Sequence, residues 1–74
     1  MKMDWAVKGA VKFDDDTVEP YEQTWTEKTA AEVESRMDTM MSRRLRKTDV
    51  VSVAFTATAD GPKGKSVIAK ATHK

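Results

Sequence analysis

One segment with the periodicity of an α-helix lies in the middle of this chain, between two stretches in which polar and apolar residues alternate. Thr29, followed three residues later by Glu32, is typical of a capping box, in which the hydroxyl and the carboxylate bind free amides at a helix N-terminus. Basic residues gather near the other end of the segment, where they complement the helix dipole. The sequence therefore predicts a helix from about Ala30 to about Arg46. The apolar residues that recur at helical spacing are Ala30, Val33, Met37, Met40, Met41 and Leu45.

The alternating stretches predict two strands on each side of the helix, because successive side chains of a β-strand point to opposite faces. A turn of three aspartates and a threonine, from Asp14 to Thr17, separates the first two strands. A run rich in glycine and proline, from Asp60 to Lys65, separates the last two. The four predicted strands cover residues 4–13, about 20–26, 49–59 and 66–72.

These elements predict a single small α+β domain over residues 1–74, with the order β-β-α-β-β. Short connections within each pair favour hairpins, so the simplest arrangement is a four-stranded antiparallel sheet with one helix packed on one face. We expect the first and third strands in the centre of the sheet, because they are the most apolar. The predicted core comprises Trp5, Val7, Val11, Phe13, Val33, Met37, Met41, Leu45, Val51, Val53 and Phe55.

The absence of cysteine from all 74 residues limits how such a chain can be stabilised. Disulfides and thiolate metal sites are excluded, and a chain of this length buries only about 60% of its unfolded surface. No stretch is apolar for long enough to span a membrane, and Met1–Phe13 lacks the continuous apolar region of a signal peptide. We therefore expect a cytoplasmic protein with one thin core.

The chain has few of the side chains that commonly act in catalysis, and we expect it not to be an enzyme. Its one histidine, His73, is the penultimate residue, and it has no cysteine to act as a nucleophile. Asp14, Asp15 and Asp16 are adjacent acids, but they lack the spaced ligand set of a calcium loop, so a solvated turn is the favoured interpretation. We predict no cofactor, no metal site and no small-molecule substrate.

The face of the predicted sheet away from the helix carries mostly small side chains, which suggests an interaction surface. A single-layer sheet with such a face suits packing against a flat partner, either a second copy or another protein. Serine and threonine are also good solvent-facing strand residues, so the pattern alone does not require a partner. The candidate interface residues are Ala6, Lys8, Ala10, Lys12, Ser52, Ala54, Thr56 and Thr58.

The leading hypothesis is a small non-enzymatic protein-interaction module that binds a partner protein through its sheet face or edge. It would be a homodimer or a regulator of the phage or mobile-element type. The alternative is an RNA- or DNA-binding module that uses the basic C-terminal end of the helix. The helix dipole also attracts basic residues, so the cluster has a purely structural interpretation too. The candidate contacts with nucleic acid or an acidic partner are Arg43, Arg44, Arg46, Lys47, Lys63 and Lys65.

At the level of pattern, the stretch from Trp5 to Phe55 resembles the small archaeal ribosomal protein LX family. The similarity rests on a hairpin that begins with a Trp-containing strand and on a capped helix that ends in the basic run Ser42-Arg43-Arg44-Leu45-Arg46-Lys47. This chain differs in having no glycine at the helix end and an additional hairpin after Asp60. The resemblance implies contact with RNA, and we use it only to retain nucleic-acid binding as the alternative.

Overall fold

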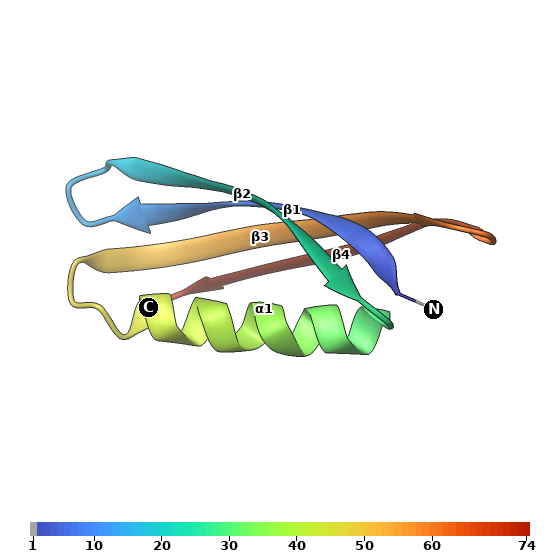
Figure 1. Cartoon of the computed structure of the whole chain (residues 1–74). Coiled ribbons are helices and arrows are strands. Elements are labelled where there is room, and N and C mark those ends of the chain that lie inside the picture. The colour runs from blue at the N-terminus through green and yellow to red at the C-terminus, as the bar shows by residue number, and fades with distance from the viewer. Residues whose placement is uncertain (1) are drawn as a thin grey trace.

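The computed structural model describes residues 2–74, in which four strands form one sheet beside a single helix (Figure 1). In chain order the elements are β1 (Met3–Phe13), β2 (Val18–Glu27), α1 (Ala30–Leu45), β3 (Val50–Gly61) and β4 (Gly64–His73). Neighbouring strands are all antiparallel, in the order β2-β1-β3-β4, and α1 lies across one face of the sheet. The expected α+β fold is confirmed, as is the central position of the first and third strands.

Helix α1 begins where the capping box predicted. The Thr29 hydroxyl accepts a hydrogen bond from the amide of Glu32 (3.3 Å), and the Glu32 carboxylate accepts one from the amide of Lys28 (3.1 Å). The first bond satisfies an amide that the opening turn of a helix leaves without a partner, and the second ties the incoming chain to the helix. The helix ends at Leu45, and Arg46 is its C-cap.

The core is a single layer of side chains between α1 and the sheet. Phe13 and Leu45, both predicted in the core, are only partly buried, whereas Trp25 of β2 is fully part of it. The buried residues are Trp5, Val7, Val11, Trp25, Val33, Met37, Met41, Val50, Val53, Phe55, Ala57 and Ala59.

The start of β3 departs from the predicted alternation. Val50 is buried and Val51 is exposed, so the prediction that Val51 belongs to the core was wrong. The cause is a shift in the β1–β3 register, since Lys12 pairs with Ser52 while the next residue, Phe13, pairs with Val50. One extra residue on β3 forms a bulge there, and such a shift changes which residues of the strand reach the core.

The two hairpin turns differ in how they are held. In the first, the Asp15 carboxylate accepts hydrogen bonds from the amide (3.1 Å) and the hydroxyl (2.5 Å) of Thr17, and these bonds lower the pKa of Asp15. The second is tighter than the six-residue turn expected, because Gly61 already pairs with Gly64 and only Pro62 and Lys63 form the loop. Gly64 has a φ of +112°, a conformation that suits glycine. Within residues 2–74, no helix has the length and apolar character needed to cross a membrane.

Candidate interaction surfaces

The face of the sheet opposite α1 is uncovered. The buried residues of β1 and β3 point toward the helix, so the residues that alternate with them lie on this outer face. The register places Ala10 beside Ala54, and Ala54 beside Ala71 of β4. All eight residues predicted as a sheet-face interface therefore share one surface, although they occupy only the two central strands.

Charge divides this outer face into two halves. Lys8 and Lys12 both lie on β1. Lys8 is paired with Glu22 on the neighbouring strand β2, and the Lys12 ammonium lies 3.9 Å from the Asp16 carboxylate. The half formed by β3 and β4 carries no charge between its ends. We call it the uncharged half-face, and its residues are Ser52, Ala54, Thr56, Thr58, Val67, Ala69 and Ala71.

Three of these residues, Val67, Ala69 and Ala71, were predicted within the last strand but not as part of the sheet-face interface. The last strand has a blurred polar–apolar alternation, because its helix side carries Ile68, Lys70 and Thr72 rather than a purely apolar row. Pairing across the hairpin turn would have found them, since the register that joins Gly61 to Gly64 also places Val67 beside Thr58. Val67 is 60% exposed.

A shallow hollow of about 470 Å³ lies in the outer face where β1, β3 and β4 meet. It is lined by the short side chains of alanines and by Lys8 and Thr56. Phe55 and Lys70 also line it, although their side chains lie on the helix side, so the hollow reaches down to the backbone. The alanines that line it are Ala10, Ala54, Ala69 and Ala71.

The side chains of the basic helix end have different environments. The Arg44 guanidinium lies over the rings of Tyr21 (5.4 Å to the centroid) and Phe55 (5.7 Å), which stack on each other at 5.2 Å. Arg36, earlier in α1, lies in the same way over the ring of Trp25, with its guanidinium 4.3 Å from the ring centroid. Such contacts hold a cation against an aromatic face. Arg44 thus forms part of the packing between α1 and the sheet.

The other cations do not form one patch. Arg43 and Arg46 line an open hollow of about 420 Å³ on the exposed side of α1, and the Lys47 carbonyl accepts a hydrogen bond from the Lys74 ammonium. Lys63 and Lys65 lie at the β3–β4 turn, at the opposite end of a molecule 43 Å long (Figure 1). The six basic residues predicted as one contact set therefore belong to two separate regions.

Acidic residues lie close to the basic helix end. The amide of Asp14, in the β1–β2 turn, donates a hydrogen bond to the carbonyl of Asp49 just after the helix (2.8 Å). Glu19 of β2 lines a small hollow together with Arg43 and Lys47. The Glu19 carboxylate reduces the positive potential that the arginines would otherwise create.

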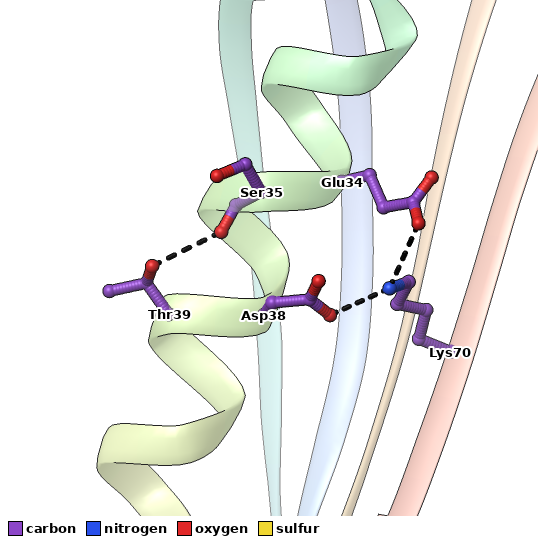
Figure 2. Close-up of polar contacts among 5 residues, drawn as sticks. All are labelled: Glu34, Ser35, Asp38, Thr39 and Lys70. Carbon is purple, nitrogen blue, oxygen red and sulfur yellow. Dashed lines mark hydrogen bonds and ion pairs between the residues drawn. The ribbon is translucent and has the colours of Figure 1, made fainter.

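Lys70 of β4 points toward the helix, as Figure 2 shows. Its ammonium lies 2.7 Å from the Asp38 carboxylate and 3.1 Å from that of Glu34. The hydrogen bonds to Asp38 and then to Glu34 raise the pKa of Lys70 above its usual value. The only charged side chain in the middle of β4 is thus neutralised by α1.

No protein-family model, curated protein or solved structure matches this chain. Among residues 2–74, no group of three or more histidine or carboxylate side chains is arranged to hold a metal ion. Trp5 has a buried indole N–H without a hydrogen-bond partner, but it lines none of the hollows described above.

Proposed function

We propose that this chain is a small non-enzymatic protein-interaction module that binds another polypeptide on the outer face of its sheet. The observation that supports this most directly is the uncharged half-face, with its alanine-lined hollow next to Val67. The central area of protein interfaces is depleted of charge, and their rims are polar. The β3–β4 half suits such a centre, and Lys8, Lys12 and Glu22 suit the rim.

The partner that fits this surface presents apolar side chains. Four alanines in a shallow hollow leave room for larger side chains to pack down to the backbone, as ridges pack into a groove. A cysteine-free chain is compatible with the reducing cytoplasm, so we place the interaction there.

Capture of partners by the immobilised protein tests this proposal. The Ala54→Arg variant puts a long charged side chain in the centre of the uncharged half-face, where the residue is exposed and the core is untouched. Ser35→Arg adds the same group on the exposed side of α1 and is the matched control. We expect specific proteins retained by the wild type and by Ser35→Arg to be lost with Ala54→Arg. Retention of the same proteins by all three, or of none by the wild type, contradicts the proposal.

The second candidate is nucleic-acid binding at the C-terminal end of α1. It is favoured by Arg43, Arg46 and Lys47, none of which has a carboxylate within 4.0 Å among residues 2–74. Fluorescence anisotropy of labelled RNA and DNA at two salt concentrations tests it. Binding that weakens steeply with salt and is lost in Arg43→Ala/Arg46→Ala supports this function, because neutralised phosphates release counterions. Absence of binding at low salt rejects it, and Lys63→Ala, at the far end, is the control.

A further inference from the structure

The free edge of β4 has a complete row of backbone hydrogen-bonding groups. The amide of Lys74 donates to the carbonyl of Val51, which identifies this pair as one that is hydrogen-bonded across β3 and β4. The register is regular along the whole strand, so the even-numbered residues of β4 bond to β3. The odd-numbered residues direct both the N–H and the C=O away from the sheet. They are Lys65, Val67, Ala69, Ala71 and His73.

The edge of β2, in contrast, is protected against pairing with another strand. The amide of Phe13 donates to the carbonyl of Thr17, so the odd-numbered residues of β2 bond to β1 and the even-numbered ones face outward. Pro20 falls in this outward row, where it has no N–H to offer, and Glu22 follows it with a charge. Proline and charge are the devices that prevent an edge strand from pairing with another chain. β4 has neither in its middle, since Lys70 is held by α1.

We propose that two copies of this chain pair antiparallel through β4, with the two-fold axis at Ala69. This inference deepens the proposed function, because it names one occupant for an edge of the interaction module. In this register every outward residue finds a partner: Ala69 pairs with its own counterpart, Val67 with Ala71 and Lys65 with His73 of the second copy. Each pair exchanges two backbone hydrogen bonds.

The side chains favour this register over its neighbours. An axis at Ile68 leaves the backbone groups of His73 without partners. An axis at Lys70 places the two Lys70 side chains opposite each other, and like charges in that position are destabilising. With the axis at Ala69, Lys70 instead lies opposite Ile68 and keeps its contacts with the helix of its own copy. Residues directly opposite then lie on the same face, as a continuous sheet requires.

Pairing at this edge also enlarges the proposed binding surface. The two-fold axis runs perpendicular to the sheet, so the outer faces of both copies lie on the same side. The uncharged half-faces then adjoin each other at β4, and Val67, Ala69 and Ala71 of both copies lie in the middle of an eight-stranded sheet. The contact itself is small, so dimerisation should be concentration-dependent rather than permanent.

Sedimentation equilibrium tests the pairing, over protein concentrations of about 10 µM to 1 mM, because so small an interface supports only modest affinity. The informative variant is Ala69→Pro, which removes the outward N–H at the axis without removing a bond to β3. Thr24→Pro makes the same kind of change on the outward row of β2 and is the matched control. Far-UV circular dichroism checks that both variants fold.

We expect the wild type and Thr24→Pro to dimerise alike, and Ala69→Pro to dissociate with a constant about tenfold higher or more, because both hydrogen bonds at the axis are lost. A wild type that stays monomeric throughout overturns the pairing. So does a dimer that survives Ala69→Pro, and loss of that dimer in Ala54→Arg would then assign it to the outer face. Capture of partners by a monomeric protein would leave the proposed function standing while the pairing fails.

A pair of charge variants keeps the test decisive if Ala69→Pro does not fold. Because the axis places residue 69 opposite itself, Ala69→Lys and Ala69→Glu should each dimerise several-fold more weakly than the wild type, through repulsion between like charges. An equimolar mixture of the two should recover the dimer. Failure of the mixture to do so overturns the proposed register.

Discussion

Gly9 lies opposite Phe55 in the centre of the sheet, and its replacement by alanine tests how tightly the core is packed. A Cβ atom at this position would lie 1.7 Å from Phe55 Cδ1 and 2.3 Å from Cε1, and 2.7 Å from the carbonyl oxygen of Ala54. Non-bonded carbon atoms need about 3.5 Å, so the ring would have to move by about 2 Å. The ring thus occupies the space that any side chain at position 9 would fill.

The Phe55 ring cannot move without losing contacts that stabilise the core. Phe55 is 1% exposed, stacks on Tyr21 and lies under Arg44. Overfilling a packed core costs about 1–3 kcal/mol, and loss of an aromatic pair costs about 0.5–1.5 kcal/mol more. Replacing glycine within a strand returns about 0.5–1 kcal/mol, because the unfolded chain loses freedom. We therefore expect Gly9→Ala to lower the free energy of unfolding by about 2 kcal/mol, near the middle of the range that these contributions give, which for a domain of this size is a drop in Tm of about 8–16 °C.

Urea unfolding followed by the fluorescence of the buried Trp5 and Trp25 measures this change. Gly61→Ala is the matched control, because its new methyl group would meet only the flexible end of Met3 at 3.3 Å, and a change within about 0.5 kcal/mol is expected. In a Phe55→Val background the penalty of Gly9→Ala should become much smaller, since the ring is gone and only the close approach to the Ala54 carbonyl oxygen remains. A Gly9→Ala protein as stable as the wild type, or a penalty that is undiminished without the ring, would refute the reasoning.

Three further predictions concern the helix and its contacts. Thr29→Ala should lower the free energy of unfolding by about 1 kcal/mol, measured by urea unfolding, because the amide of Glu32 loses its cap. Arg44→Ala should destabilise by about 0.5–1 kcal/mol through loss of its aromatic contacts, whereas Arg43→Ala should leave the thermal midpoint unchanged; equal effects would contradict the distinct roles. Lys70 has a raised pKa in the folded state, so its stabilising effect is present below its usual pKa of 10.5 and is lost as pH rises through the folded value. The stability difference between the wild type and Lys70→Met should therefore shrink in urea melts at increasingly alkaline pH, and a constant difference would refute the ion-pair explanation.

Sequence reasoning succeeded where the signal is local. The capping box of Thr29 and Glu32 placed the start of the helix correctly, because both hydrogen bonds close within a few residues. Alternation located all four strands, and the turn residues separated them in pairs. The order of the strands also followed, since the two most apolar strands bury most surface in the centre of the sheet.

The candidate interaction surfaces could be predicted from the sequence only in part. The small residues of β1 and β3 were predicted as one face from alternation alone, and Val67, Ala69 and Ala71 join them through the hairpin register. The basic run at the helix end looks uniform in the sequence. In the folded chain Arg44 packs on Tyr21 and Phe55, and Lys63 and Lys65 lie at the far end of the molecule.

The sequence by itself thus determined the elements, their order and the side of β1 and of most of β3 that faces the helix, because periodicity and capping depend on neighbours along the chain. The tertiary structure alone decided which residues meet across the sheet. A bulge opposite Phe13 buries Val50 in place of Val51, the Phe55 ring requires a glycine at position 9, and Asp38 and Glu34 hold Lys70 away from the β4 edge. Each of these depends on register between segments far apart in the chain, which no local pattern of residues specifies.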